Sequence, residues 1–561
     1  MTNNNNKPRN SVSAQKAWSP RPEKAPAKKS GKAKFVGSMQ KAAKGWYTKV
    51  EVPTLASGLT YTENGAIAHA STGSALVDIN FQIAAMRGMD EKAIVTKWRK
   101  AYTENPRLAL RWLGWILDIR MGQGERRLSK IIITDMMDNG GEAIVCELIK
   151  LIPEYGRFDM LYNYTSNPVV GKAVANLIRT QWKQDMANMK DGKPISLQAK
   201  WLSSANSRNA NTRKEGMWTA KVLKLTERQY RKGLTDLRKY LDVVERKMSS
   251  DNWQAIDYEK VPSKANLIYK NAFLKHDEER RKAYLEALTS GEAKINSSVA
   301  YPHEIVCKYG KSLWNYSPNQ VDPALEGMWK ALPDLVNDDA STLVVADGSG
   351  SMCSCIAGTS ATALMVANAL AIYFGERAKG PYANTYITFS QTPKFVSWKE
   401  NASLKDKLCE AYRHCECANT NIEAVFNLIL NTAINTHAKQ EDLPKNLLII
   451  SDCQFDSMCD AGRNSSGWGS KKVTKTLMDS LADKFKANGY TMPNLIFWCV
   501  TGGTGRAENY PIKEDDRGIM VSGFSVNTLK MVMSGKMDPY GALVEVLMDK
   551  RYAPFEAALK K

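Results

Sequence analysis

The stretch "TLVVADGSGSMCSC" at residues 342–355 decides the fold and poses the question of function. Its first five residues are apolar or β-branched, which is typical of a strand buried on both faces of a parallel sheet. The run ends on Asp347, and Ser349 and Ser351 follow at alternate positions with glycines between them. Glycine lets such a loop curl, so one carboxylate and two hydroxyls can face one point. The stretch therefore predicts a buried strand that ends in a cluster of oxygen ligands.

Similar apolar runs recur along residues 336–535, and helical stretches separate them. The runs are "TYITF" (385–389), "NLLIIS" (446–451), "NLIFWCV" (494–500) and "GIMVS" (518–522), and the helical stretches are 358–378, 421–436 and 472–488. Strands that alternate with helices predict an α/β, doubly wound parallel sheet. Ligands of such sheets bind beyond the carboxyl ends of the strands, where Asp347 and Asp452 both fall.

Five side chains form a candidate metal site. Thr420 precedes a helix in "CANTNIEAVF" (417–426), and Asp452 closes "LLIISD" (447–452). Together with Asp347, Ser349 and Ser351 they supply hard oxygen ligands, which suit Mg²⁺ or Mn²⁺. The ordered set resembles the metal-ion-dependent adhesion site (MIDAS) of von Willebrand factor A domains. The competing interpretation is that Asp and Ser are ordinary turn residues at strand ends.

Enzymatic motifs do not fit the chain. The "GKS" at 310–312 has Ile305 where a P-loop needs glycine, and neither Ser349 nor Ser351 lies in a G-x-S-x-G elbow. No histidine is adjacent in sequence to Asp347 or Asp452, so no general base is evident. Two C-x-C pairs (353/355 and 415/417) could hold zinc, but their spacing differs from the usual C-x-x-C, and we leave zinc out of the predicted site. The sequence predicts a protein that is not an enzyme.

The N-terminal half divides into a basic tail and a helical region. Residues 1–50 carry twelve Lys or Arg against one acid, which is +11 of the net +20 of the chain. This composition predicts a disordered tail, either merely solvated or acting as a basic arm for RNA, DNA or an acidic partner. Residues 51–335 show helical periodicity, as in "PRLALRWLGWILDIR" (106–120), a Pro-interrupted pair at 143–164 and a long amphipathic helix at 226–248. They predict a multidomain chain that begins with an all-α helical-repeat region and ends with a helical extension at 536–561.

A second basic stretch lies within the helical region. Residues 200–247 hold thirteen Lys or Arg against five acids, with Trp201, Trp218 and Tyr230 interspersed. Basic grooves with aromatic side chains are typical of single-strand binding. The alternatives are a solvated helix face and, for the "IRMGQGERR" turn at 119–127, a helix–helix connection. The residues predicted to bind RNA are Arg120, Arg126, Arg127, Lys200, Arg213, Lys214, Lys221, Lys224, Arg228, Arg231 and Lys232.

The chain resembles the DUF2828 family over residues 85–550. The segments that carry the resemblance include "DIRMGQGERRL" (118–128), "LIPEYGRFDML" (151–161), "SLQAKWLSS" (196–204), "AIDYEKVPSKA" (255–265) and "ISDCQFD" (450–456). The family implies a helical region followed by a von Willebrand A-like domain. The loop "VADGSGSM" departs from the more frequent "DVSGSM" but keeps the coordinating positions. The architecture is also similar to Ro-type (TROVE-domain) RNA-binding proteins, which is an analogy of fold.

These features lead to one functional expectation and one alternative. The N-terminus lacks an apolar signal segment, no membrane span is visible, and ten cysteines in 561 residues indicate reduced thiols, so we expect a cytoplasmic protein without membrane contact. We expect a non-enzymatic RNA-binding protein with a Mg²⁺ (or Mn²⁺) site for a carboxylate or phosphate ligand. The alternative is a protein-interaction scaffold whose metal binds an acidic partner and which does not bind RNA.

Overall fold

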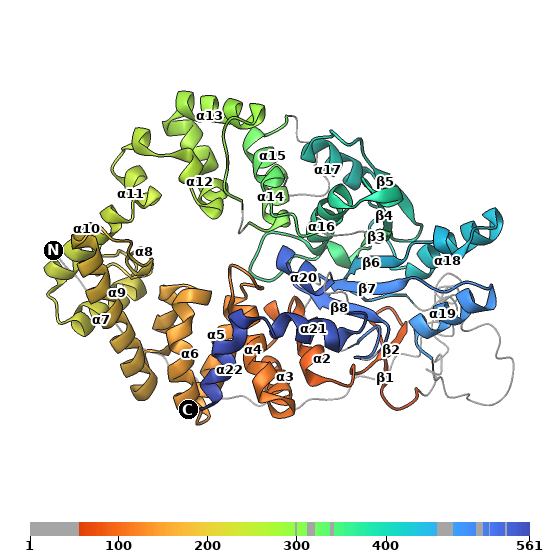
Figure 1. The fold of residues 1–561 in the computed structure, drawn as a ribbon, viewed down its shortest axis with the longest axis horizontal. Coiled ribbons are helices and arrows are strands. Elements are labelled where there is room, and N and C mark those ends of the chain that lie inside the picture. Colours follow the sequence, from red (N-terminus) through yellow and green to blue (C-terminus); the bar gives the residue numbers. More distant parts are fainter. Residues whose placement is uncertain are drawn as a thin grey trace, which may run out of the picture. The chain divides into compact units, whose positions relative to one another are not determined.

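The computed structural model describes residues 55–297, 300–310, 320–336, 341–456, 475–500, 509–514, 516–532 and 536–560 (Figure 1). The basic tail predicted at residues 1–50 lies outside the described residues. No helix in the described ranges has the length and apolar character that a membrane crossing requires.

The chain before residue 337 is mainly helical, as the sequence predicts. Its α-helices are α2 (Ala75–Phe81), α3 (Glu91–Glu104), α4 (Pro106–Leu117), α5 (Arg126–Asp138), α6 (Glu142–Tyr155), α7 (Pro168–Lys190), α8 (Gln198–Trp201), α9 (Ala210–Leu223), α10 (Glu227–Tyr240), α11 (Val244–Ser249), α12 (Ser263–His276), α13 (Glu278–Ser290), α14 (Pro302–Tyr309) and α15 (Pro323–Lys330). Short 3-10 helices are η1 (Ala85–Arg87), η2 (Phe158–Tyr164), η3 (Trp253–Ala255) and η4 (Tyr258–Lys260). Neighbours in sequence pack on one another, as α2 does on α3 and α6 on α7.

Two helices illustrate why these segments form. The Asn105 side chain caps α4 by accepting from the Leu108 amide, and Pro106 occupies the first turn, where it removes no helical hydrogen bond. Every residue of α4 from Leu108 to Leu117 is buried, so α4 is a core helix. In contrast, α10 buries Tyr230, Gly233, Leu234 and Leu237, which recur at the spacing of one helical face, and leaves its other residues exposed except for the half-buried Arg238.

The structure differs from two of the expected helices. The stretch 226–248 is not one helix, because the chain breaks between α10 and α11, where Asp242 adopts a φ of 53°. In the stretch 143–164, Pro153 lies inside α6 without ending it, and the following segment is the 3-10 helix η2.

A β-hairpin also interrupts the region expected to be all-α. Strands β1 (Leu59–Tyr61) and β2 (Ile67–His69) pair antiparallel, with Thr60 opposite Ala68. The turn between them closes through the hydrogen bond from the Thr62 amide to the Ala66 carbonyl, and Gly65 adopts a φ of 90°. Glycine tolerates this left-handed conformation, which a side chain would strain.

The C-terminal region contains a six-stranded sheet. Its strands are β3 (Thr342–Asp347), β4 (Thr385–Phe389), β5 (Lys394–Ser397), β6 (Asn446–Ser451), β7 (Asn494–Cys499) and β8 (Gly518–Ser522). The strand order is β5-β4-β3-β6-β7-β8; β5 is antiparallel to β4, and the other neighbours are parallel. Because β3 pairs with β4 on one side and β6 on the other, the winding reverses there. This is the doubly wound order, with its switch point at β3.

Helices connect the strands of the sheet and continue the chain after β8. They are α16 (Ala363–Arg377), α17 (Leu404–Arg413), α18 (Ile422–Thr436), α19 (Leu477–Ala487), α20 (Leu529–Val532), α21 (Pro539–Leu547) and α22 (Ala553–Ala557), with the 3-10 helices η6 (Ser351–Cys353), η7 (Gly380–Tyr382), η8 (Gln440–Asp442), η9 (Val526–Thr528), η10 (Lys550–Tyr552) and η11 (Ala558–Lys560). Helix α16 packs on β3, β4 and β6, and its residues 363–375 are all buried.

The last helices of the chain return to the helical region. Helices α21 and α22 pack on α4 (Figure 1), and the Arg111 guanidinium donates to the Leu547 carbonyl at 2.9 Å. Phe555 is fully buried, and its ring meets the Tyr155 ring edge-on at 4.8 Å. The predicted C-terminal extension is therefore helical and completes the packing around α4.

Candidate metal centre and basic helical surface

Asp347 lies at the carboxyl end of β3, at the switch point of the sheet. Its side chain is fully buried. The carboxylate accepts from the Ser349 amide at 2.8 Å and from the Ser451 hydroxyl at 2.5 Å. These two bonds fix the orientation of the carboxylate, and they account for only part of its capacity to accept.

Three of the predicted ligands converge with Asp347. The Ser349 and Ser351 hydroxyl oxygens are 3.1 Å apart, and the Ser351 side chain is close enough to Asp452 to lower the pKa of its carboxylate, against the larger effect of burial. Ser349 and Asp452 are buried, whereas Ser351 is exposed. The structure thus brings four of the five predicted residues into one cluster that reaches solvent at Ser351.

Thr420, the fifth predicted ligand, is buried. It lies in the loop before α18, which contacts both the loop after β3 and the loop after β6. The Cys417 amide donates to the Gly348 carbonyl at 3.0 Å, and the Gly350 amide donates to the Ala418 carbonyl at 2.9 Å. On its other side, Thr420 and Asp456 exchange two hydrogen bonds: the Thr420 amide donates to the Asp456 carboxylate, and the Asp456 amide donates to the Thr420 carbonyl. Thr420 therefore lies between the loop after β3 and the loop after β6.

Close packing against β4 requires a glycine at position 348, directly after Asp347. A Cβ atom at Gly348 would lie 2.9 Å from the Thr388 hydroxyl and 3.3 Å from the Phe389 carbonyl. The Gly348 amide donates to that carbonyl at 2.7 Å, which holds the loop against β4. A side chain at this position would push the Asp347 loop away from the sheet.

The electrostatics of the cluster fit a divalent cation. Burial, followed by repulsion from the Asp452 carboxylate, raises the pKa of Asp347, and burial raises the pKa of Asp452. No Lys or Arg in the described ranges forms an ion pair with either carboxylate. Two adjacent buried carboxylates are unfavourable unless a positive charge compensates them. The donors are carboxylate and hydroxyl oxygens, which match Mg²⁺ and Mn²⁺.

Sequence reasoning missed two polar neighbours of the cluster. Ser451 ends β6 beside β3, and its position at a strand end was a usable signal. Asn64, in the β1–β2 turn, donates to the Thr420 hydroxyl at 3.2 Å and to the Gln454 carbonyl at 2.6 Å. Asn64 and Thr420 are 356 residues apart, so no local pattern linked them.

The nearby cysteines form a thiol cluster. The Cys417 sulfur is 3.3 Å from the sulfurs of both Cys353 and Cys415. Burial, with a smaller contribution from the hydrogen bonds to Cys417, raises the pKa of the Cys353 and Cys415 thiols, which disfavours the thiolate that zinc requires. Within the described ranges, no group of three or more His, Cys, Asp or Glu side chains could hold a metal ion. The structure gives no support to a zinc site there.

Most of the predicted RNA-binding cations lie exposed on α9, on α10 or at the turn between them. The exposed members are Arg213, Lys214, Lys221, Lys224, Arg228, Arg231 and Lys232. Arg231 lies 3.6 Å from Glu227, one helical turn away. For Lys214, Lys221, Lys224, Arg228 and Lys232, the structure shows no ion pair within the described ranges. The two helices pack together and form a basic surface, which we call the α9–α10 surface.

Of the other four predicted cations, Arg120, Arg127 and Lys200 have partners within the protein, although Arg120 and Arg127 are exposed. Arg120 donates to the Glu154 carbonyl, and Arg127 donates to the Met86 and Met89 carbonyls at 2.9 and 3.0 Å. Lys200 is half-buried and lies 3.9 Å from Glu245. Arg126, at the start of α5, is exposed. The 119–127 turn therefore contributes to helix packing, as the helix-connection alternative supposed.

Trp201 and Trp218, the tryptophans of the second basic stretch, are half-buried and packed against other side chains. The Arg157 guanidinium covers the Trp201 ring at 3.9 Å, and the Trp218 ring meets Tyr162 edge-on at 6.1 Å. One face of Trp201 is thus already occupied by a cation.

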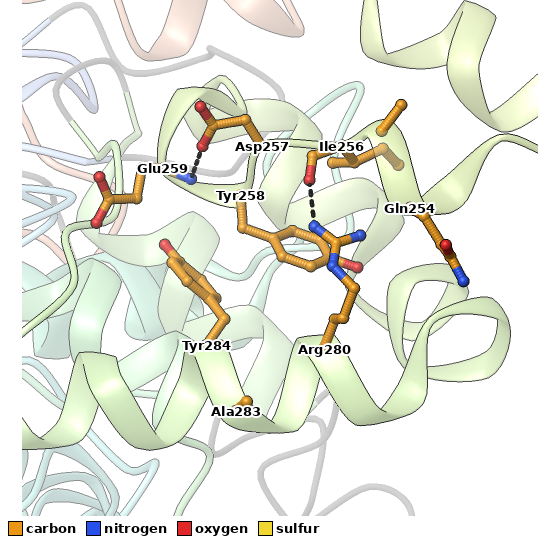
Figure 2. Close-up of a pocket in the computed structure, with 9 residues that line it drawn as sticks. Gln254, Ile256, Asp257, Tyr258, Glu259, Arg280, Ala283 and Tyr284 are labelled. Atoms are coloured by element: carbon orange, nitrogen blue, oxygen red, sulfur yellow. Dashed lines mark hydrogen bonds between the residues drawn. The ribbon is translucent and has the colours of Figure 1, made fainter.

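A separate open pocket of about 510 Å³ lies between residues 254–259 and α13 (Figure 2). The Tyr258 and Tyr284 rings line it, with centroids 5.3 Å apart, together with the acids Asp257 and Glu259. Arg280 also lines it, but its guanidinium is held by the Ile256 carbonyl at 2.8 Å. None of the predicted metal-binding or RNA-binding residues lines this pocket.

Comparison with known proteins divides the chain at the start of β3. Residues 158–341 match the domain of unknown function DUF2828, and residues 341–551 match another, DUF7788. The solved Ro (RSR) protein of Deinococcus radiodurans aligns over 79% of this chain and 93% of its own, with 14% identity and a TM-score of 0.34. "Uncharacterized protein L728" of Acanthamoeba polyphaga mimivirus is 30% identical over 538 residues, covering 88% of this chain and 87% of that protein. The expected DUF2828 match is confirmed, and the chain belongs to the same protein family as L728.

Proposed function

We propose that this chain is a non-enzymatic RNA-binding protein that also carries a Mg²⁺-dependent (or Mn²⁺-dependent), von Willebrand A-type site for a carboxylate or phosphate ligand. The observation that carries the metal part is the pair of buried carboxylates, Asp347 and Asp452, at the switch point of the sheet. The observation that carries the RNA part is the exposed α9–α10 surface.

The residues of the cluster have separable roles in this proposal. Asp347 and Asp452 would supply the negative charge that retains the ion, and the hydroxyls of Ser349, Ser351 and Thr420 would complete its inner set without adding charge. A bound divalent ion supplies an electrophilic coordination position that accepts an anionic oxygen. Because Ser351 is the exposed member, a ligand would approach from its side.

The side chains around the cluster favour binding over turnover. The Ser349 and Ser351 hydroxyls hydrogen-bond each other, and among the described residues no histidine hydrogen-bonds to any of the five. General-base catalysis needs a base within hydrogen-bond reach of the proton it abstracts. These contacts support the capture of an anion.

A protein-interaction scaffold remains the second candidate. It is favoured by the cations that the protein uses internally, such as Arg120 and Arg127. In that case the metal would bind an acidic side chain of a partner, and the α9–α10 surface would only promote solubility.

Two measurements on the full chain test the proposal. Calorimetric titration with Mg²⁺ should show one site, and filter binding of a single-stranded RNA should weaken as salt rises. If about six phosphates are neutralised, the log–log salt slope should be about −4, since each single-strand contact contributes roughly −0.7. Deletion of residues 1–45, which lie outside the described residues, should flatten the slope for all sequences alike. Mg²⁺ binding without RNA binding at low salt would favour the scaffold.

A further inference from the structure

Three thiols lie together where the loop after β3 meets the loop before α18. Cys353 closes η6 in the first loop, and Cys415 and Cys417 belong to the second. The Cys417 sulfur is 3.3 Å from the Cys353 sulfur and 3.3 Å from the Cys415 sulfur. A disulfide bond is about 2.0 Å long, so closure of either pair requires an approach of only about 1 Å. All three residues are half-buried, so none is sealed in the core.

Backbone hydrogen bonds fix Cys417 at this place. The Cys417 amide donates to the Gly348 carbonyl at 3.0 Å, and the Ala418 carbonyl accepts from the Gly350 amide at 2.9 Å. Cys417 adopts a φ of 51°, a left-handed conformation that is unfavourable for a residue with a β carbon and that glycine adopts freely. The chain therefore carries local backbone strain at the residue whose sulfur contacts both other thiols.

The two possible disulfides differ in what they would join. Cys415 and Cys417 are separated by one residue, so a bond between them would stay within one loop and leave little freedom to reach the geometry that a disulfide requires. Cys353 and Cys417 are 64 residues apart in sequence, and a bond between them would join the two loops. The Cys415 thiol would then lie beside the Cys417 sulfur, where thiol–disulfide exchange gives the link a route to reopen.

We propose that Cys353 and Cys417 are a site of reversible thiol oxidation, at which a low-molecular-weight disulfide converts the pair to an intramolecular disulfide. In the first step one cysteine sulfur attacks the small disulfide, its S–S bond breaks, and a mixed disulfide forms as one small thiol leaves. In the second step the other cysteine sulfur attacks the mixed disulfide and releases the second small thiol. The two cysteine sulfurs are oxidised, the small disulfide is reduced, and both thiol protons end on the released thiols.

The disulfide would act on the candidate metal centre without depending on it. Ser349 and Ser351 lie in the loop after β3, and Thr420 lies in the loop before α18, so the bond would fix one of these loops against the other. Its formation requires neither a bound cation nor RNA. Failure of this inference would therefore leave the proposed function untouched, and the reverse also holds.

The test incubates the folded full chain with oxidised glutathione until the number of free thiols is constant. The incubation is long because burial raises the pKa of the Cys353 thiol, which slows its reaction. Alkylation and mass spectrometry should show the loss of two thiols without glutathione retained at positions 353 and 417. Digestion without reductant should give one peptide linked through Cys353 and Cys417, and excess reduced glutathione should restore both thiols. In urea, which separates the two loops, the same treatment should give less of this linked peptide.

Two substitutions identify the pair. Cys415→Ser should keep both the linked peptide and the loss of two thiols. The matched control Cys146→Ser removes a half-buried thiol from α6 and should behave as the wild type. Melting temperatures in reducing buffer should agree among the variants, which shows that they fold. A link between Cys415 and Cys417 in the folded wild type, an equal yield of the linked peptide in urea, or no link at all would overturn the proposal, and these wild-type results decide it even if a variant does not fold.

Discussion

Asp347 is a buried carboxylate whose surroundings favour the binding of a cation beside it. The Ser451 hydroxyl and the Ser349 amide hold its carboxylate in place, and its burial beside Asp452 makes its negative charge unfavourable. In a preorganised site of this kind the side chains are already oriented before the ion binds, so ion binding does not have to supply the free energy of ordering them. The residue is therefore expected to affect metal binding strongly and folding without metal only weakly.

Substitution of Asp347 by asparagine tests this expectation. The amide keeps the shape and can still accept from the Ser349 N–H, but it removes one of the two carboxylate charges. Mg²⁺ affinity should fall at least 100-fold in calorimetry. The melting temperature in chelator should stay the same or rise, because the repulsion with Asp452 is gone. Wild-type Mg²⁺ affinity, or an unfolded apo protein, would contradict the prediction.

His303 predicts how stability depends on pH. Burial, with a smaller contribution from the nearby Arg87 charge, lowers the pKa of His303 to about 3. The ring is 5% exposed, lies between Tyr301 and Phe524, and has no hydrogen-bond partner at Nδ1 among the described residues. Because the unfolded chain protonates this histidine near its ordinary pKa of about 6.5, the unfolded state binds more protons below that pH. Folding stability should therefore fall as pH drops from about 6.5 toward 3.

The measurement is urea unfolding at pH 7.5 and pH 5.5 for the wild type and for His303→Gln. One such group contributes on the order of 1 kcal/mol of the loss between pH 6.5 and 5.5. The variant should lose less stability on acidification than the wild type, and the comparison at pH 7.5 removes the effect of the substitution itself. An identical pH dependence in both proteins would show that His303 is not the group responsible.

At the scale of secondary-structure elements, helices α9 and α10 pack inward through one face and expose the cations of the α9–α10 surface on the other. Helix α10 faces inward with Tyr230 and Leu234, and its exposed positions include Arg228, Arg231 and Lys232. A Cβ atom at Gly216 of α9 would lie 2.5 Å from the Ala205 amide nitrogen, so α9 packs directly against the backbone of residues 204–205. The helices are held rigidly by their inner faces, and their cations can be changed without disturbing that packing.

Charge reversal on this surface should weaken RNA binding. The double variant Lys221→Glu/Lys232→Glu should lower single-stranded RNA affinity in filter binding. Its log–log salt slope should be less negative by roughly 0.7 for each lost phosphate contact. The matched control is Lys130→Glu/Lys399→Glu, which makes the same change of charge at exposed positions elsewhere. Equal losses in both variants would mean that only the net charge matters and that α9–α10 is not the binding surface.

The success of the sequence predictions depended on how each element is buried. The strands β3, β6, β7 and β8 were found because both faces are covered, which leaves continuous apolar runs. Strand β5 was missed because it is an edge strand in which only Val396 is buried. The split between α10 and α11 was missed because the break rests on the left-handed conformation of Asp242, and the helical periodicity continues through it.

In the candidate site, the residues that could be predicted are those marked by local sequence features, and those brought in by tertiary packing could not be predicted. Asp347, Ser349 and Ser351 could be predicted because they lie within five residues, and Thr420 and Asp452 because each occupies a definable end of a helix or strand. The contact of Asn64 with Thr420 could not, because it depends on tertiary packing across more than 350 residues. Similarly, the sequence predicts Arg127 as an RNA-binding residue, with a helix connection as the alternative, because its carbonyl partners at Met86 and Met89 cannot be read from the sequence.

At the scale of the whole molecule, the domain boundary at residue 341 is not a packing boundary. The hairpin before α2 contacts the loop after β6, and the helices after β8 contact α4 and α6. Arg551 is paired with the fully buried Asp118 carboxylate, and Glu556 with Arg111. Residues 55–157, which precede the DUF2828 match, therefore pack against the DUF7788 region and against the helix that follows it.

Substitution of Phe555 tests how much this packing contributes to stability. Its ring lies directly on Gly114 of α4, where a Cβ atom would be 2.6 Å from Cδ2 of the ring. Phe555→Ala should lower the free energy of unfolding by about 3–5 kcal/mol in urea denaturation, as for other buried phenylalanines. The control Met548→Ala, in the same segment but 51% exposed, should change it by about 0.5 kcal/mol or less. A small effect of Phe555→Ala would show that the C-terminal helices are dispensable for the core.

The return of the last helices to α4 also sets the order of events during synthesis. The Leu547 carbonyl that Arg111 contacts follows it by 436 residues. Since ribosomes add about 5–20 residues each second, α4 emerges roughly 20–90 s before its C-terminal partners exist. During that interval a helix whose residues 108–117 are all buried in the finished protein has part of its apolar surface open to water. The native packing around α4 can therefore form only after α21 and α22 have left the ribosome.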